Sequence, residues 1–262
     1  MTAADDGPVD SAGPVGSAWA AAQDAAAHTF VGSLDDAVEI AGADGHHLQR
    51  VRRLRVGEHV TAADGAGAWR RYEIDAIEPG RLHLSARGER FRDPELVPGV
   101  ALAIALTKAG ALDTVVARCT ELGVARITPV RARRCVVQWD AAHGERAVER
   151  LRTVAREAAA QCRRAHLPEI APVANLADFA GRADVVVADR GGGSIDDLPS
   201  PRSAWTVVVG PEGGLDPDEL EAFAGAGRLR LGPHVLRAET APIAAVAVLL
   251  SRAREMFREW PV

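Results

Sequence analysis

From Val100 onward, short apolar strands alternate with amphipathic helices along the chain. Five segments have the composition of buried strands: VALAIALT, ARITPV, ADVVVAD, AWTVVVG and GRLRL. Helical patterns separate several of these segments, and parallel strands need such crossovers between them. The second part of the chain is therefore predicted to be an α/β domain with a mostly parallel sheet.

Glycine, proline and threonine mark the expected ends of three helices in this part. A helix over residues 111–124 has Gly123 at its C-terminal cap, and a long amphipathic helix over 145–168 ends at Pro168. The last helix is largely buried, and Thr240 suits its N-terminal cap. The positions expected on the buried faces of the first two helices are Val115, Val116, Cys119, Leu122, Val148, Leu151, Ala155, Ala158 and Cys162.

The region from residue 28 to residue 84 has a different pattern, with short strand-like pieces separated by Asp-Gly and Pro-Gly turns. The pieces HTFVG, EHVTAADG, AWRRYEIDAIE and RLHLSA predict a small β-barrel. The segment GHHLQRVRRLRVGE interrupts them. In this segment His47, Val51 and Leu54 have the spacing of one helical stripe, and Gly57 is expected to end the helix.

Charge is distributed unevenly along the chain. The net charge of −5 argues against a nucleic-acid partner, but residues 1–45 hold eight acidic residues and no Lys or Arg. The remainder has 31 basic and 28 acidic residues, and all the basic ones except Lys108 are Arg, which suits bidentate phosphate contacts. Residues 1–22, rich in Ala, Gly, Asp, Ser and Pro, are expected to form a disordered acidic extension.

Several classes of protein are excluded by composition. No apolar run approaches the roughly 18 residues of a membrane span, and no signal peptide is recognisable, so we expect a cytoplasmic protein without a membrane partner. The three cysteines lack C-x-x-C spacing, which argues against a disulfide framework or a zinc site. No metal is expected.

Two strand-to-helix junctions near the C-terminus are the first candidates for a binding site, because ligands of open α/β sheets bind beyond the carboxyl ends of the strands. The first is VVVGPEGGLDPDEL, a strand followed by a glycine-rich loop. Asp216, Pro217 and Glu219 suit the N-cap, N1 and N3 positions of a capping box. The loop has neither the lysine of a P-loop nor a G-x-G-x-x-G pattern, so a tight turn without a ligand is an equal alternative.

The second junction is LRLGPHVLRAETAPIAAVAVLL, with a strand over 229–231, a loop and the last helix. Arg237 and Glu239 lie in the loop close to the helix start. For one such pair a surface ion pair is the commoner explanation. Two such loops this close in sequence favour a shared pocket.

These two junctions resemble the paired C-terminal motifs of the RsmE family, which are bacterial 16S rRNA uridine-N3 methyltransferases of the SPOUT (trefoil-knot) superfamily. ALTKAGALDTVVARCTELGVARITPV, EAAAQCRRAHLPEI and HHLQRVRRLRVGE resemble further family segments, so the resemblance covers about residues 28–258 in order. Three features depart from the family pattern. His234 stands where Arg is usual, Arg118 replaces a lysine, and the acidic extension is additional.

The resemblance implies a PUA-like RNA-binding β-barrel over residues 23–95 and a methyltransferase domain with a C-terminal knot over 96–262. It also implies a homodimer that binds S-adenosylmethionine, a ligand without a phosphate, and acts on 16S rRNA or the 30S subunit. The cofactor-binding residues implied are Val209, Gly210, Pro211, Glu212, Gly213, Leu231, Gly232, Leu236, Arg237, Thr240, Ala241 and Ile243.

The implied reaction needs a uridine N3 that has lost its proton, since the neutral base is a poor nucleophile there. Arg237 is the candidate for stabilising the developing negative charge. Glu239 or Glu212 is the candidate for accepting the proton or for orienting Arg237, and the sequence does not rank these roles.

Two groups of arginines are candidates for RNA phosphate contacts, although solvated charged faces are the ordinary alternative. With Lys108, the candidates are Arg50, Arg52, Arg53, Arg55, Arg131, Arg133 and Arg134. Two other functions stay open: a knot methyltransferase that modifies a ribose 2′-oxygen, and a noncatalytic RNA-binding protein of the same fold.

Overall fold

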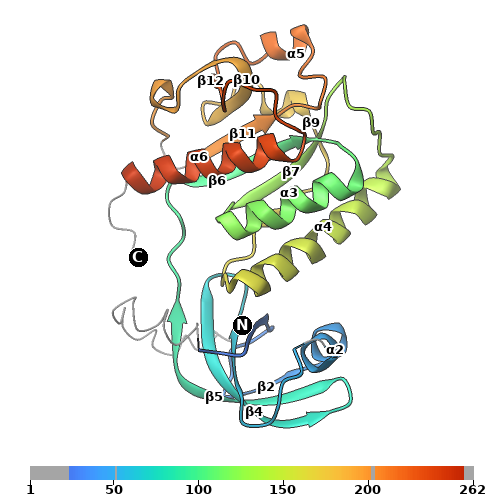
Figure 1. Cartoon of the computed structure of the whole chain (residues 1–262), viewed down its shortest axis with the longest axis vertical. Helices are drawn as coiled ribbons and strands as arrows, with labels where there is room; N and C mark the ends of the chain where they lie inside the picture. The colour runs from blue at the N-terminus through green and yellow to red at the C-terminus, as the bar shows by residue number, and fades with distance from the viewer. Residues whose placement is uncertain (1–23, 51, 202–203, 257–262) are drawn as a thin grey trace, which may run out of the picture. The chain divides into compact units, whose positions relative to one another are not determined.

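A computed structural model describes residues 24–50, 52–201 and 204–256 of the chain, which divides into two compact units (Figure 1). Among these residues the first unit holds 24–95 and 159–167, and the second holds 96–158 and 168–256. The first unit therefore includes a short segment that the sequence analysis placed in the second domain. The acidic extension expected over residues 1–22 lies outside the described residues.

The first unit is built on a five-stranded sheet in the order β1-β3-β4-β5-β2. Strands β1 and β3 pair in parallel and the other neighbours pair antiparallel. Val60, Tyr72, Ile74 and Leu82 are fully buried in its core. The sequence pattern did not reveal β2, because only its last residue, Ile40, is buried. The strands are β1 (Ala27–Phe30), β2 (Ala37–Ile40), β3 (His59–Ala63), β4 (Ala68–Glu78) and β5 (Arg81–Arg92).

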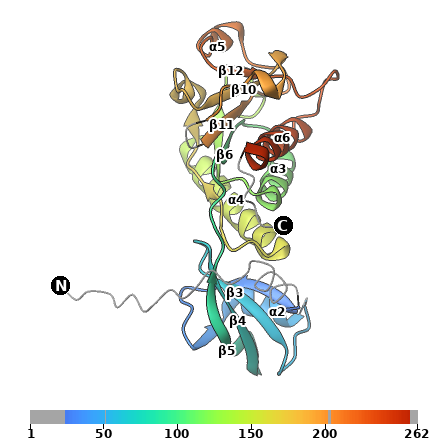
Figure 2. The same cartoon turned by 90° about the vertical axis from the view of Figure 1, so that its left-hand side faces the viewer.

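Helix α2 (Gly42–Arg50) lies beside the strands of this unit (Figure 2). It packs on the turn between β4 and β5. A Cβ atom at Gly45 would lie 2.4 Å from the carbonyl oxygen of Gly80, so only glycine allows this approach. The side chain of Gln49 donates to the carbonyl oxygens on both sides of the turn, at 2.6 and 2.9 Å.

The stripe expected in this segment is wrong at His47 and Leu54, and its third member, Val51, lies outside the described residues. The helix buries Gly45 and Leu48, and His47 is exposed. The helix also ends at Arg50, before Leu54, which is buried outside it. The reason is tertiary, because the close approach at Gly45 determines which face of α2 turns inward.

The second unit contains a seven-stranded parallel sheet, as the alternating pattern predicted. The order is β12-β10-β11-β6-β7-β8, with β9 also paired to β7. Every recorded pair in this sheet is parallel. The strands are β6 (Gly99–Ala105), β7 (Arg126–Arg131), β8 (Glu169–Ile170), β9 (Ala174–Asn175), β10 (Val185–Gly193), β11 (Ala204–Val209) and β12 (Gly227–Leu229).

Helices cover this sheet and bury alternate residues of its strands. On one face lie α3 (Ala109–Leu122), α4 (Ala141–Cys162) and α6 (Thr240–Met256) (Figure 1). Their side chains pack against Leu102, Ile104 and Val207 of the sheet. On the other face Ala103, Ala105 and their neighbours pack against the short helix η1 (Leu176–Phe179) and residues near α5 (Pro217–Glu221). A further short helix is η2 (Ile195–Asp197). A small β-sheet unit followed by a parallel α/β unit is thus observed, as the sequence predicted.

The helix ends agree with the sequence in part. Gly123 has φ 109° and caps α3, as predicted. Helix α4 ends at Cys162 and not at Pro168, because the next residues leave the helix and hydrogen bond within the first unit. Arg163 has φ 61°, and the backbone N–H of Leu167 donates to the carbonyl oxygen of Gly65 at 2.9 Å.

Two boundaries near the second junction are shifted. The strand expected over residues 229–231 is β12 and ends at Leu229. Thr240, expected before the last helix as its N-cap, is the first residue of α6. The shift of the strand lengthens the loop between these two elements.

Candidate functional site

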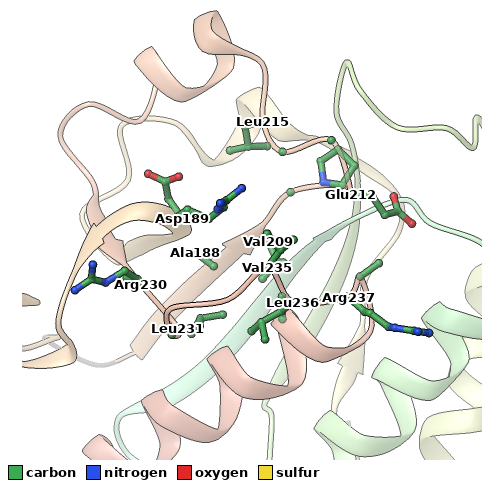
Figure 3. A pocket seen from close by; sticks show the side chains of 18 of the residues that line it. Ala188, Asp189, Val209, Glu212, Leu215, Arg230, Leu231, Val235, Leu236 and Arg237 are labelled. Carbon is green, nitrogen blue, oxygen red and sulfur yellow. The ribbon is translucent and has the colours of Figure 1, made fainter.

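The carboxyl ends of β10, β11 and β12 open into a cavity of about 270 Å³ (Figure 3). These strands are neighbours in the sheet, so the chain segments that follow them converge at one edge. Two loops supply most of the lining. We call residues 210–215, after β11, the glycine loop, and residues 230–239, after β12, the arm.

The glycine loop folds as a tight turn that leads directly into a capped helix. The backbone N–H of Gly214 donates to the carbonyl oxygen of Pro211 at 2.8 Å, and Gly214 has φ 71°, which glycine adopts without strain. Asp216 accepts from the backbone N–H of Asp218, and Glu219 accepts from that of Asp216. The capping box predicted for α5 is therefore present.

The side chain of Glu212 is held by a residue that the sequence analysis passed over. The hydroxyl of Thr107 donates to Glu212 Oε1 at 3.0 Å. Thr107 is buried just after β6, which is next to β11 in the sheet, so its side chain is held in place where it meets the glycine loop. Glu212 itself is exposed, and Figure 3 shows its carboxylate on the same side of the cavity as Arg237.

The arm is anchored mainly at its ends. At one end the backbone N–H of Arg230 donates to the carbonyl oxygen of Gly193 at 3.0 Å. At the other end the carbonyl oxygen of Arg237 accepts from the backbone N–H groups of Thr240 and Ala241. Between these points Val235 is 69% exposed, although it lines the cavity. The guanidinium of Arg237 is exposed and forms no ion pair within the described part of the chain. The arm thus presents a free cation beside the cavity.

Most of the residues predicted for the cofactor lie together at this cavity. Its lining includes Val209, Gly210, Pro211, Glu212, Gly213, Leu231, Gly232, Leu236, Arg237 and Ala241. Thr240 and Ile243 belong to α6 and are not among the lining residues, and neither is Glu239. Of the three catalytic candidates, Arg237 and Glu212 therefore line the cavity, and Glu239 does not.

The third wall of the cavity was missed from the sequence. Ala188, Asp189 and Arg190 line it from β10. Asp189 forms an ion pair with Arg228, which comes from the adjacent strand β12. The sequence did contain a signal for this wall. The apolar segment ADVVVAD ends in a polar residue, and ligands of open α/β sheets bind beyond the carboxyl ends of the strands. Further lining residues that were not predicted are Gly214, Leu215, Leu229, Arg230, His234, Val235 and Ala238.

The arginines assigned to RNA fall into two classes. Arg50, Arg52, Arg53 and Arg55 are exposed around the end of α2 in the first unit. In the second unit Lys108 and Arg131 are exposed. Arg133 and Arg134, by contrast, contact the glycine loop and the start of α5.

Two further observations concern the chemistry available at this edge of the sheet. Cys135 lies beside the same elements, and burial raises the pKa of its thiol, which makes it a weak nucleophile at neutral pH. Across the described ranges no group of three or more His, Cys, Asp or Glu residues is arranged to hold a metal ion.

None of the helices described is both long and apolar enough to cross a membrane.

Comparison with known proteins relates both units to RNA methylation. Residues 95–250 match the RNA methyltransferase domain family, and residues 40–86 match the RNA methyltransferase PUA domain. The protein named ribosomal RNA small subunit methyltransferase E of Mycobacterium bovis is 36% identical over 242 residues, which is 85% of this chain and 92% of that protein.

Solved structures share the fold of almost the whole chain. A methyltransferase of Legionella pneumophila in complex with the cofactor SAM is 26% identical, with a TM-score of 0.78. The ribosomal RNA small subunit methyltransferase E of Neisseria gonorrhoeae, solved bound to S-adenosyl methionine, is 24% identical, also with a TM-score of 0.78. Each likeness covers 86% of this chain and 97% of the other.

Proposed function

The chain belongs to the ribosomal RNA small subunit methyltransferase E family, and we propose that it methylates N3 of a uridine in 16S rRNA with S-adenosylmethionine as methyl donor. The family match and the 36% identical relative confirm the RsmE resemblance. The observation that carries the proposal is the joint cavity, in which the glycine loop and the arm meet at the ends of three parallel strands. A tight turn without a ligand does not account for that convergence.

The lining of the cavity fits an adenosine that carries an amino-acid tail. Leu231, Leu236 and Val209 provide apolar side chains, while the glycines of the loop expose backbone hydrogen-bonding groups. Asp189 adds a carboxylate that suits a ribose hydroxyl or an ammonium group. S-adenosylmethionine, when bound, supplies an electrophilic methyl group on a sulfonium.

Arg237 and Glu212 are the residues that we assign to the uridine. The N3–H proton has to leave before N3 attacks, and we assign its acceptance to a carboxylate oxygen of Glu212. Glu212 is preferred to Glu239 because it lines the cavity and Thr107 holds its carboxylate. The exposed guanidinium of Arg237, free of an ion pair in the described residues, stabilises the negative charge that remains on the uracil.

The rest of the chain is assigned to recognition of the ribosomal substrate. The exposed arginines at residues 50, 52, 53 and 55 of the first unit are proposed to contact RNA phosphates, together with Lys108 and Arg131. We further propose a homodimer, a C-terminal knot and a cytoplasmic location, which the family resemblance and a ribosomal substrate support.

Two measurements test the proposed function. Calorimetry with S-adenosylmethionine separates an enzyme from a noncatalytic RNA-binding protein, and absence of binding at millimolar ligand would exclude both methyltransferase hypotheses. Depletion of the protein followed by mapping of methyl groups in 16S rRNA separates N3 from a ribose 2′-oxygen. We expect one N3-methyluridine to disappear, and its retention would count against the N3 assignment.

A further inference from the structure

Arg133 and Arg134 follow β7 in the chain and contact the glycine loop and the start of α5. About 80 residues of sequence separate them from these segments, so local sequence signals do not predict the contact. Both lie in the same compact unit as the cavity. These arginines either bind RNA phosphates, as their clustering in the sequence suggested, or hold the wall of the cavity.

Arg134 contacts the second half of the glycine loop and the first residue after it. Its Nη1 donates to the carbonyl oxygens of Gly213 at 3.1 Å and Leu215 at 3.4 Å. Its Nη2 lies 3.3 Å from Asp216 Oδ2. The planar guanidinium suits such a set of acceptors, which a lysine ammonium cannot match. Both terminal nitrogens of Arg134 thus contact residues 213–216.

Arg133 secures the helix that follows the loop. Its backbone N–H donates to Glu219 Oε1 at 2.8 Å, and its Nη1 contacts Asp216 and Asp218 at 3.1 and 2.7 Å. Asp216 and Glu219 form the capping box of α5, so Arg133 ties the cap itself to the segment after β7. The C-terminal end of the glycine loop is therefore held through the start of α5.

We propose that Arg134 is a positioning residue for the cofactor, which it serves by holding the glycine loop in its binding shape, with Arg133 holding the adjacent cap. The proposal rests on the proposed function, because that function places S-adenosylmethionine at the loop. Three of the six loop residues are glycine, so the free loop loses much backbone entropy on ordering. A brace that orders the loop in advance removes part of this cost from binding.

The proposal is tested with the full-length protein and the variants Arg134→Gln and Arg134→Lys. Arg126→Gln is the matched control, because Arg126 is an exposed, ion-paired arginine at the opposite end of β7. Three quantities are measured: S-adenosylmethionine affinity by calorimetry, hydrogen exchange of the amides of residues 210–216 without ligand, and affinity for purified small ribosomal subunits. Thermal unfolding establishes that each variant is folded.

We expect Arg134→Gln to weaken S-adenosylmethionine binding about tenfold, the effect of losing charge-assisted hydrogen bonds of this kind. Amide exchange in the loop becomes faster, and ribosomal-subunit affinity is unchanged. Arg134→Lys keeps the charge but loses the guanidinium, so it shows the same defects. It also carries the test if the glutamine variant does not fold.

A phosphate contact by Arg134 predicts the reverse pattern. Unchanged cofactor affinity and unchanged loop exchange in both variants would overturn the proposal, whatever happens to ribosomal-subunit affinity. If the wild-type protein does not bind S-adenosylmethionine, the proposed function fails. The exchange measurement then decides the brace alone: faster exchange supports it, and unchanged exchange removes it.

Discussion

The glycine loop and the arm line one cavity but are held in place by different means. The glycine loop has an internal turn and is braced by Thr107 below it and by Arg134 beside it. The hydrogen bonds of the arm, as far as the described residues show, lie at its two ends. Val235, between these ends, is exposed, and so is Arg237, whose carbonyl oxygen forms the second anchor.

This difference matches two tasks that one cavity has to perform. Binding of a small cofactor is tighter when the wall is ordered before the ligand arrives. An RNA substrate has to enter and leave, and segments with few buried contacts are the ones that move at low cost. We infer that the glycine loop is the preordered wall for the cofactor. The arm adds Leu231 and Leu236 to that pocket and carries Arg237 to the uridine.

The largest expected effect is on the arm. Arg237→Ala removes the cation proposed to stabilise the uracil anion, and we expect kcat to fall by about 10² to 10³. Cofactor affinity and thermal stability stay near the wild-type values, because the side chain is exposed and forms no ion pair in the described part of the chain. Single-turnover methylation of ribosomal subunits measures the effect, with Arg126→Ala as control. Near-normal turnover would remove Arg237 from the mechanism.

A smaller effect is expected from the brace below the glycine loop. Thr107→Val keeps the shape of the side chain but removes the hydrogen bond to Glu212. We expect kcat to fall about tenfold, which is the worth of one hydrogen bond to a charged group. An unchanged rate would show that the hydrogen bond from Thr107 does not help Glu212 to accept the proton.

A pair of glycine variants compares the two segments directly. A Cβ at Gly210 would lie 3.0 Å from Leu215 Cδ2 and 3.2 Å from its backbone nitrogen, whereas a Cβ at Gly232 meets nothing within 4 Å. We expect Gly210→Ala to cost about 1 kcal/mol of stability, seen as a lower melting temperature. Gly232→Ala should leave that temperature unchanged. Equal effects from the two variants would mean that the two loops are held alike.

The smallest effect is expected outside the described residues. Deletion of residues 1–22 should leave methyltransferase activity largely unchanged, since the family resemblance begins near residue 28. Steady-state kinetics on ribosomal subunits are the measurement. A large loss would show that the acidic extension takes part in substrate recognition.

Local signals predicted the features of this chain that depend on nearby residues. The parallel sheet followed from apolar runs between helical patterns, and the α5 capping box followed from the spacing of Asp216 and Glu219. The positive φ of Gly123 at the end of α3 was equally local. The two caps depend on the backbone within a few residues of the signal, which is why the sequence sufficed for them. The sheet joins distant strands such as β6 and β11, and it followed from the rule that strands alternating with helices pair in parallel.

The features that were missed depend on contacts between distant segments. The inward face of α2 is determined by the approach of Gly45 to Gly80, and α4 ends early because of hydrogen bonds to residue 65. The attachment of Arg134 to the glycine loop spans about 80 residues of sequence. Arg134 was a candidate for phosphate contacts for the same reason that it suits carbonyl oxygens: the guanidinium binds either.

The most direct test of the central claim is the identity of the methylated atom. Purified protein is incubated with methyl-labelled S-adenosylmethionine and small ribosomal subunits that lack the modification, and the nucleosides of the 16S rRNA are analysed by mass spectrometry. We predict that the label appears in N3-methyluridine at a single position. Label in a 2′-O-methylated nucleoside, or no label in the RNA, would contradict the account.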